Sequence, residues 1–361
     1  MKKYIMLGLF TVLILMPNHI SGSYSFENIR KNETEKHGII SEQQPKQSEQ
    51  NLRIAVGGDV LLDRSVGRLI DKHGNDSIWG DVKGILTSAD ISMVNLESPL
   101  SHRGCKEKDK QFIFRGKPQY VKALESAGID IVSLANNHIL DYGEIALSDT
   151  MKHLDDTGIL YAGAGQNDDA AYTPVYIDKG TVRLAVLSAS HVIPFAHWRA
   201  EKNKPGIASA YDPARLLSEV KTASEKADIV LVYLHWGKEM KTQPEQYQKN
   251  IARSLIDAGA DLVVGSHPHI IQGLEFYKGR LIAYSLGNLV FTNSSRETMV
   301  LDVSFLGQEI SEAYVIPCII KSSKTMLVKD DQKKQEFLGK LNMLSPDVLI
   351  HEDGRLEQKG P

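Results

Sequence analysis

The sequence predicts an α/β fold whose sheet is largely parallel in its first part, and two observations lead to this prediction. From Leu52 onward, short β-branched runs alternate with longer amphipathic segments, which is the order of elements in βαβ units. Several of the short runs are apolar on both faces, as central strands covered on each side are. The final runs follow one another without helices between them and are therefore expected to be antiparallel.

The expected elements can be assigned in chain order from this alternation. The expected strands are LRIAVGGD (52–59), ADISMVNLE (89–97), IDIVSLANNH (129–138), ILYAGAG (159–165), VRLAVLSAS (182–190), ADIVLVYLHWG (227–237), ADLVVGSHPH (260–269), RLIAYSLGNLVF (280–291), TMVLDVSF (298–305) and AYVIPCII (313–320). The expected helices include 117–128, 212–227 and 244–259. In the last of these, Tyr247, Ile251 and Leu255 recur every four residues, and Gly259 is placed to close the helix in a left-handed conformation.

The N-terminus has the layout of an export signal. Residues 1–23 contain two lysines, an apolar stretch from Tyr4 to Met16, then Pro17 and small residues. The apolar stretch is shorter than the roughly 20 residues that span a bilayer comfortably, which favours a cleaved signal peptide over a permanent N-terminal anchor. Residues 24–50, rich in Glu, Gln, Lys and Ser, are expected to form a flexible polar linker.

The folded domain is expected to span residues 51–330 and to lie outside the cytoplasmic membrane, either secreted or attached to its outer face. Residues 331–361 are charged and weakly periodic, and they either pack on the domain as a tail or extend from it toward a partner. With a formal net charge of −3 the chain offers no basic stripe for a phosphate backbone, so nucleic acid is not expected as a partner. Cys105 and Cys318 could form a disulfide in an oxidising compartment, but the sequence does not establish that they approach each other.

Four of the expected strands share a frame of polar residues. Each begins with an aspartate where the preceding helix ends, runs through apolar residues, and reaches a side chain of a ligand type. The four pairs are Asp90 and Glu97, Asp130 and Asn137, Asp228 and His235, and Asp261 and His267. At about 3.3 Å per residue each run is long enough to cross a sheet once. The ligand-type residues are therefore expected to collect at one edge, where Asp59 joins them from the first strand.

That edge is where ligands of open α/β sheets bind, outside the carboxyl ends of the strands. The side chains delivered there are Asp59, Glu97, Asn137, His138, His235, His267 and His269. Carboxylate, amide and imidazole groups without a thiolate suit one or two divalent ions such as Mn, Fe or Zn, and two ions bridged by a carboxylate would use the whole set. The alternative for any single member is a residue that caps a strand or binds water at its end.

The histidines of this set are expected to differ in role. His267 and His269 are expected to lie in an extended segment, which would point both imidazoles to the same side. His138 directly follows Asn137, so its imidazole is displaced by one position and is a candidate general acid toward a leaving group. Asp141, three residues further on, either orients that imidazole or lies in an exposed loop.

Eight short motifs along the chain resemble those of a known protein family. The motifs are GGDVLLDR, NLESPL, FRGKP, SLANNHILDYG, YAGAG, HWGKE, GSHPHIIQG and YSLGNLVF. In this order and spacing they resemble the CapA-type poly-γ-glutamate capsule-synthesis family, whose domain is similar to the calcineurin-like metallophosphoesterases. The resemblance covers residues 52–320. It implies a four-layer α/β/β/α sandwich outside the membrane, associated with a membrane-bound synthetase complex that makes or exports poly-γ-glutamate or another anionic polymer.

The resemblance also implies roles for the polar residues. The first phosphoesterase aspartate falls on Asp59, the bridging acid on Glu97, the asparagine–histidine pair on Asn137 and His138, and the remaining histidines on His235, His267 and His269. Phosphoesterases usually carry a histidine two residues after the first aspartate, and this sequence has Leu61 there, so one ligand for one of the two ions is missing. Arg64 and Arg115 are candidates for gripping anionic groups, with solvated surface arginines as the alternative.

Several functions are compatible with these features. The first is an extracytoplasmic component of poly-γ-glutamate biosynthesis or export, with a metal-centred cleft for an anionic polymer. The second is a secreted metal-dependent hydrolase of phosphate esters or γ-glutamyl amide bonds, and Leu61 leaves catalysis open. The third is an inert binding module that keeps the ligand geometry. The sequence contains neither a glycine-flanked nucleophilic serine nor a Walker-type loop, so ATP-driven ligation is not expected in this chain.

Overall fold

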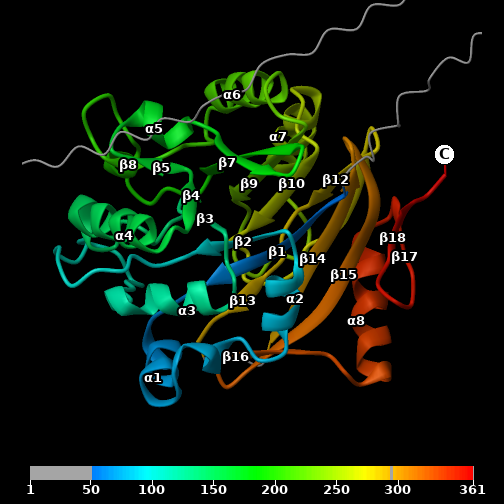
Figure 1. Cartoon of the computed structure of the whole chain (residues 1–361), viewed down its shortest axis with the longest axis horizontal. Helices are drawn as coiled ribbons and strands as arrows, with labels where there is room; N and C mark the ends of the chain where they lie inside the picture. The colour runs from blue at the N-terminus through cyan, green and yellow to red at the C-terminus, as the bar shows by residue number, and fades with distance from the viewer. Residues whose placement is uncertain (1–50, 293–295, 361) are drawn as a thin grey trace, which may run out of the picture. The chain divides into compact units, whose positions relative to one another are not determined.

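Two β-sheets packed face to face, each covered on its outer face by helices, form the part of the chain that the structure describes (Figure 1). The structure is a computed structural model, and it describes residues 51–292 and 296–360, which lie in one compact unit. The expected signal peptide (1–23) and linker (24–50) lie outside the described residues. Within those residues, no helix is long and apolar enough to cross a membrane.

The first sheet combines parallel and antiparallel strands. Its strands are β1 (Asn51–Val60), β2 (Ile91–Leu96), β3 (Ile131–Ser133), β4 (Leu160–Ala162), β13 (Asn288–Val290), β14 (Arg296–Leu306), β15 (Glu309–Lys321) and β16 (Lys324–Leu327). They are ordered β16-β15-β14-β1-β2-β3-β4, with β13 pairing in addition with the end of β1. The early strands β1 to β4 pair in parallel, and β14 to β16 pair antiparallel. This confirms the predicted change from parallel to antiparallel pairing along the chain.

The second sheet is parallel at its centre and antiparallel at both edges. Its strands are β6 (Val175–Lys179), β7 (Val182–Ser190), β9 (Ile229–His235), β10 (Leu262–Ser266), β11 (Leu274–Tyr277) and β12 (Arg280–Ala283), in the order β11-β12-β10-β9-β7-β6. The short strands β5 (Ala164–Gly165) and β8 (Gly206–Ile207) pair separately, as do β17 (Val348–Ile350) and β18 (Leu356–Gln358). The parallel strands β7, β9, β10 and β12 place their carboxyl ends at one edge.

Helices cover the outer faces of both sheets. The helices are α1 (Arg64–His73), α2 (Val82–Ser88), α3 (Val121–Ser126), α4 (Gly143–Thr157), α5 (Asp168–Tyr172), α6 (Ala214–Ser224), α7 (Gln246–Asp257) and α8 (Asp331–Leu344). Helices α1 to α4 pack on the first sheet, and α5 to α7 pack on the second. Three short 3₁₀ turns, η1 (Asn75–Ile78), η2 (Pro118–Tyr120) and η3 (Ala196–Trp198), also lie among the described residues, and η2 replaces the first turn of the helix expected over 117–128.

The side chains of a central strand show how the layers separate. In β9, Ile229, Leu231 and Tyr233 face the core between the two sheets. Val230 and Val232 alternate with them and face the helices on the outer side. Successive side chains of a strand point to opposite faces, and those of β9 are apolar on both faces. The strand must therefore be covered by another layer on each side. The predicted four-layer α/β/β/α sandwich is confirmed.

The run 280–291, expected as one strand, is instead divided between the two sheets. Its first part is β12 in the second sheet, and its last part is β13, which lies beside β1 in the first sheet. Gly287 causes the break, because its φ of 74° lies in the left-handed region, which extended strands do not use. The chain entering β13 lies close against β1, since a Cβ atom built on Gly58 would lie 1.8 Å from the carbonyl oxygen of Gly287.

The predicted left-handed ending of the helix at Gly259 is confirmed. Helix α7 ends at Asp257, and Gly259 follows with a φ of 111°. The N–H of Gly259 donates to the carbonyl of Ile256 at 3.0 Å, and the N–H of Ala260 donates to the carbonyl of Leu255 at 2.9 Å. This pair of bonds is a Schellman motif, and it delivers the chain directly into β10.

The C-terminal segment packs on the domain. Phe337, Leu338 and Leu341 of α8 are buried in the core between the sheets, and β17 and β18 follow α8. The N–H of Val315 in β15 donates to the carbonyl of Gly354 at 2.9 Å, which fixes the chain after β17 to the first sheet. The two cysteines are free thiols, Cys105 exposed and Cys318 buried.

The four aspartates at the starts of the expected strands, which precede Glu97, Asn137, His235 and His267, have a structural role. Each carboxylate accepts a hydrogen bond from the first backbone N–H groups of the neighbouring strand. The bonds run from Arg53 to Asp90, from Ser92 to Asp130, from Arg183 to Asp228 and from Val230 to Asp261, at 2.7 to 2.8 Å. These carboxylates therefore fix the start of each strand at the edge opposite the ligand-type residues, and so set the register in which those residues arrive.

We predict that Asp130→Ala lowers the free energy of unfolding by about 1–2 kcal/mol, because the N–H of Ser92 loses its charged acceptor. Asp130→Asn keeps an acceptor oxygen and is expected to cost less. Urea unfolding followed by circular dichroism measures both values. Equal stability of the alanine variant and the wild-type chain would contradict this role for the carboxylate.

Candidate metal centre

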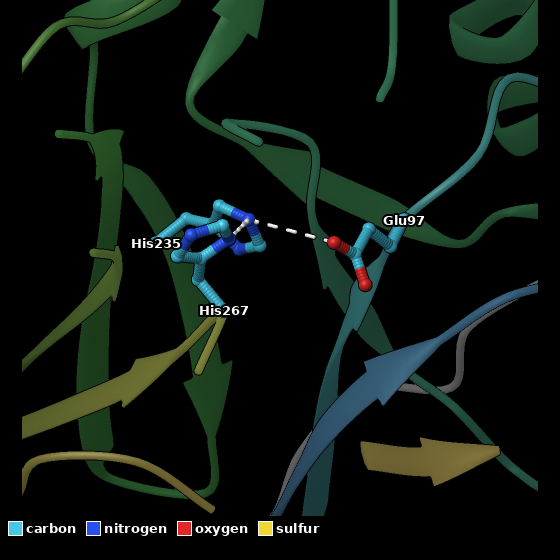
Figure 2. Close-up of side chains that lie close together, drawn as sticks. All are labelled: Glu97, His235 and His267. Carbon is cyan, nitrogen blue, oxygen red and sulfur yellow. Dashed lines mark hydrogen bonds and ion pairs between the residues drawn. The ribbon is translucent and has the colours of Figure 1, made fainter. Parts of the chain in front are cut away.

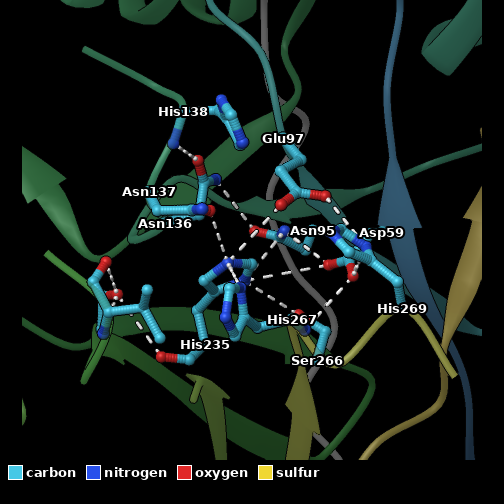
Figure 3. A network of polar contacts seen from close by, with 12 residues as sticks. Asp59, Asn95, Glu97, Asn136, Asn137, His138, His235, Ser266, His267 and His269 are labelled. Atoms are coloured by element: carbon cyan, nitrogen blue, oxygen red, sulfur yellow. Dashed lines mark hydrogen bonds and ion pairs between the residues drawn. The ribbon is translucent and has the colours of Figure 1, made fainter. Parts of the chain in front are cut away.

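The predicted ligand set gathers at the carboxyl ends of the strands, where the two sheets meet (Figure 3). Asp59 lies at the end of β1, and Glu97 directly follows β2. His235 is the last residue of β9, and His267 follows β10. All four side chains are buried. Asn137 and His138 come from the loop after β3, and His269 from the loop after β10, which completes the set expected at this edge.

Glu97 is the member with the least satisfied polar group. Its side chain is fully buried, and neither carboxylate oxygen has a hydrogen-bond partner among the described residues. An ionised carboxylate is costly to bury unless an opposite charge or a metal ion meets it. The two oxygens face different neighbours: His235 and His267 on one side (Figure 2), and Asp59 and His269 on the other. A carboxylate in this position fits the bridge between two ion positions.

The first ion position is formed by Glu97, His235 and His267, whose ligand atoms lie within 4.8 Å of one another. His235 Nε2 lies 3.6 Å from Glu97 Oε1 and 3.2 Å from His267 Nδ1. The amide oxygen of Asn137 lies 2.9 Å from the same nitrogen. One carboxylate oxygen, one amide oxygen and two imidazole nitrogens therefore converge, and this donor set suits Mn, Fe or Zn.

The second ion position is formed by Asp59, Glu97 and His269. His269 Nδ1 lies 3.5 Å from Asp59 Oδ2 and 4.0 Å from Glu97 Oε2. Leu61, where phosphoesterases usually have a histidine, is fully buried, and its N–H donates to the carbonyl of Val290 at 2.9 Å. This position therefore keeps three acidic or histidine ligands, one fewer than the family pattern implies.

The protonation equilibria of the site agree with a cation-binding role. Burial holds the pKa of His235 well below its ordinary value and lowers that of His267 to about 3, so both imidazoles are neutral and free to ligate. Burial and the charge of Asp59 raise the pKa of Glu97. Burial opposes a charged His269, but the carboxylates of Glu97 and Asp59 overcome it and raise its pKa to about 9. A metal ion that binds His269 must therefore displace its proton.

The extended conformation expected for His267 and His269 is wrong. β10 ends at Ser266, and the φ angles of His267 and His269 are 99° and 60°, in the left-handed region. Such angles are costly for residues with a Cβ atom and are kept where surrounding bonds determine them. Here the N–H of His267 donates to Asp59 Oδ2 at 3.2 Å. Both imidazoles still reach the site, because the chain turns around the Asp59 carboxylate.

His138 and Asp141 form the pair that the sequence suggested. His138 Nδ1 lies 2.7 Å from Asp141 Oδ2, and Asp141 is fully buried, so the alternative of an exposed loop aspartate is wrong. Lys110 joins them: its Nζ lies 2.9 Å from His138 Nδ1, bonds to Asp141 and donates to the carbonyl of Asn137 at 2.5 Å. Burial lowers the pKa of His138, so the imidazole is neutral at rest.

Arg64 and Arg115, the predicted anion-binding residues, form no hydrogen bond or ion pair with the carboxylates of the centre among the described residues, and each guanidinium instead lies over an aromatic ring. The guanidinium of Arg64 lies 4.4 Å from the ring of Phe114, which packs on His138 with 4.5 Å between ring centroids. The guanidinium of Arg115 lies 3.9 Å from the ring of Tyr142. Their role in binding anionic groups stays a prediction.

Sequence reasoning missed several residues of the site. Asn95 Nδ2 donates to Asp59 Oδ1 at 2.8 Å, and Ser266 Oγ lies 3.1 Å from His235 Nδ1. Glu239, exposed on the loop after β9, lies close to His267 and His269. The sequence could have indicated Asn95, because it is a polar residue within an otherwise apolar, buried strand. Glu239 ends the HWGKE motif, but the sequence analysis gave it no role. No local pattern pointed to Lys110, since its partners come from another loop.

Comparisons with known proteins agree with this geometry. Residues 53–293 match the family model of the bacterial capsule synthesis protein PGA_cap. The chain is 34% identical over 249 residues to the capsule biosynthesis protein CapA of Bacillus anthracis, covering 67% of this chain and 60% of that protein. It is 32% identical over 305 residues to the PGA biosynthesis protein CapA of Bacillus subtilis (strain 168), covering 83% of this chain and 80% of that protein. The chain thus spans less than two thirds of the Bacillus anthracis relative.

A solved structure supports the fold. The chain is similar to a novel phosphatase from Mycoplasma pneumoniae with a TM-score of 0.51 and 11% sequence identity, over 75% of this chain and 94% of that one. At this identity the similarity concerns the fold alone. It agrees with the predicted metallophosphoesterase-like architecture.

We predict that Glu97→Gln stabilises the metal-free protein and removes bound metal. Because the pKa of Glu97 is raised from 4.5, the metal-free protein loses stability as the pH rises from that value through the raised pKa. The amide of glutamine does not ionise, so the variant does not lose this stability. Urea unfolding at pH 8 with a chelator should therefore give a free energy of unfolding about 1 kcal/mol or more above that of the metal-free wild type. Elemental analysis should show less bound metal.

The matched control is Glu275→Gln, at a buried carboxylate that accepts bonds from Arg253 at 2.7 Å and Tyr284 at 2.7 Å. This variant is expected to lose stability and keep its metal. A Glu97→Gln variant that is less stable than the metal-free wild type, or that holds as much metal as the wild type, would contradict the assignment.

Proposed function

This chain belongs to the bacterial capsule synthesis protein family PGA_cap, and from that premise we propose that it is an extracytoplasmic component of poly-γ-glutamate capsule biosynthesis or export. In this role its metal-centred cleft binds the anionic polymer. The observation that carries the proposal is the Glu97 carboxylate, buried without a hydrogen-bond partner between two sets of imidazole and carboxylate ligands. The names of the relatives in Bacillus anthracis and Bacillus subtilis support the capsule role.

The cofactor of this site is one or two divalent ions, with Mn, Fe or Zn favoured by the mixed oxygen and imidazole donors. Bound there, an ion polarises a carbonyl or phosphoryl oxygen and lowers the pKa of a bound water. The protein would hold the ions through Asp59, Glu97, Asn137, His235, His267 and His269. His138, held by Asp141 and Lys110, would present its other ring nitrogen to a bound substrate.

A cavity of about 610 Å³ beside the centre offers a place for the polymer. Its lining includes Met240, Ile270, Met343 and Lys340, together with Arg296, whose guanidinium lies 3.4 Å from the carbonyl oxygen of His269. Lys340 is paired with Glu297, whereas no carboxylate among the described residues pairs with Arg296. A wall of methylene and thioether groups, with one guanidinium that has no carboxylate partner among the described residues, suits a chain that alternates methylenes and carboxylates. Arg64 and Arg115 are proposed as further contacts for anionic groups.

We place the protein outside the cytoplasmic membrane, either secreted or attached to its outer face. The support is the lysine-flanked apolar stretch in residues 1–23, which lies outside the described residues. The proposed partner is a membrane-bound polymer synthetase complex. This assignment rests on the capsule-synthesis relatives, since no residue of the described surface identifies a partner protein.

A second candidate is a secreted metal-dependent hydrolase of phosphate esters or γ-glutamyl amide bonds. The observation that favours it is the buried His138 and Asp141 pair beside the ligand set, because a neutral imidazole held by a carboxylate can take up a proton and pass it to a leaving group. Leu61 weighs against it, since one ion position has fewer ligands than the family pattern implies.

For the polymer role, we predict that the metal-loaded full-length chain binds γ-linked pentaglutamate more tightly than α-linked pentaglutamate, measured by calorimetry. Arg296→Gln should raise the Kd for the γ-linked peptide about tenfold, because the ligand loses a charged hydrogen-bond partner. Arg183→Gln, at the opposite sheet edge, removes the same charge and should leave the Kd unchanged. Equal affinities of all three chains would contradict polymer binding in this cavity.

The hydrolase candidate predicts cleavage of a generic phosphate ester or shortening of poly-γ-glutamate by the metal-loaded chain. His138→Ala should then slow the reaction by about 100- to 10,000-fold while the metal content stays unchanged. Product release and chain length are the measurements. If the metal-loaded wild-type chain cleaves neither substrate, the hydrolase is excluded and the binding role remains.

A further inference from the structure

The unsatisfied polar atoms of the interior mark Asn288, a residue of the YSLGNLVF motif to which the sequence analysis gave no role. Among the described residues, the buried side-chain nitrogen and oxygen atoms without a hydrogen-bond partner are both carboxylate oxygens of Glu97 and Nδ2 of Asn288. All of them lie at the candidate metal centre. A buried amide nitrogen without an acceptor is costly in a native protein. Its presence here points to a group that the protein itself does not supply.

The backbone places Asn288 beside the ligands of the second ion position. Asn288 is the first residue of β13, and its Cα atom is in register with that of Asp59. The N–H of Asp59 donates to the carbonyl of Gly287 at 3.0 Å. Two residues further on, the N–H of Leu61 donates to the carbonyl of Val290. β13 therefore runs along the segment of β1 where the family pattern has its additional histidine.

The side-chain atoms converge on the same place. The amide oxygen of Asn288 lies 2.7 Å from His269 Nδ1. The same nitrogen faces Asp59 Oδ2 at 3.5 Å and Glu97 Oε2 at 4.0 Å, so it is the nitrogen turned toward the carboxylates. Asn288 is 1% exposed. Two carboxylate oxygens, one imidazole nitrogen and one amide oxygen thus surround the second ion position.

The chemistry of His269 decides what the amide oxygen does when an ion is present. A ligating imidazole nitrogen carries no proton, so Nδ1 can no longer donate to Asn288. Two lone pairs would then face each other at about hydrogen-bond distance, which is repulsive unless a cation lies against both. Amide oxygens are accepted ligands of divalent ions.

We infer that Asn288 is the fourth protein ligand of the ion held by Asp59, Glu97 and His269, and that it takes the place that Leu61 leaves empty. The inference rests on the metal centre of the proposed function. It explains how a chain with Leu61 can still hold two ions, one on each side of Glu97. The first ion position does not contain Asn288 and keeps Asn137 as its amide ligand.

The test measures Mn²⁺ binding to the full-length chain by equilibrium dialysis, with electron paramagnetic resonance to separate coupled pairs from single ions. We expect two ions and a coupled signal in the wild type. Asn288→Ala should retain one ion and give an uncoupled signal. Its affinity for the second ion, held by Asp59, Glu97 and His269, should fall at least about tenfold. Asn288→Asp keeps an oxygen ligand of the same size and should retain both ions. Asn250→Ala, at an exposed amide on α7, is the control and should match the wild type.

An Asn288→Ala chain that holds two coupled ions with unchanged affinity would overturn the inference and leave the proposed function intact. A wild-type chain that binds a single ion would also overturn it. A wild-type chain that binds no ion would remove the metal centre itself, and with it the proposed function. Circular dichroism and the urea midpoint confirm that each variant is folded, and Asn288→Asp, which keeps the side-chain volume, separates loss of the ligand from loss of packing.

Discussion

The burial of the Glu97 carboxylate without a hydrogen-bond donor is the constraint on which the rest of the site depends. Burial keeps His235 and His267 neutral, so they cannot supply a compensating charge. His269 can be protonated, but it faces two carboxylates, those of Asp59 and Glu97. One negative charge is therefore left over in a closed space. A divalent cation satisfies it, because His235 and His267 are already neutral, as ligands must be, and His269 becomes a ligand once it loses its proton.

The fold holds this arrangement from both ends of its strands. At the distant edge, frame aspartates such as Asp130 fix the register by accepting the first N–H groups of neighbouring strands. At the near edge, Gly58 allows the chain entering β13 to lie against the end of β1, since a side chain on Gly58 would collide with the backbone of Gly287. Asp59 follows Gly58 directly and receives an N–H from His267 of the other sheet. The same contact bends the histidine loop and joins the sheets.

Local patterns in the sequence predicted much of this site, because a strand with a fixed start and length delivers its last residue to a known edge. Asp59, Glu97, Asn137, His235 and His267 were found in this way, and the family resemblance supplied the four layers. What failed depended on contacts between distant segments. The left-handed backbone at His267 follows from a bond to Asp59, and the division of the run 280–291 follows from Gly287. Lys110 and Asn288 have partners that no periodicity connects to them.

In the proposed metal centre, Glu97 bridges two ion positions. X-ray diffraction from crystals of the Mn²⁺-loaded protein, recorded at the manganese absorption edge, tests it most directly. We expect two anomalous peaks about 3.5 to 4 Å apart, one on each side of the Glu97 carboxylate. The absence of any anomalous peak within reach of Glu97, in crystals of a protein shown to be folded, would contradict it.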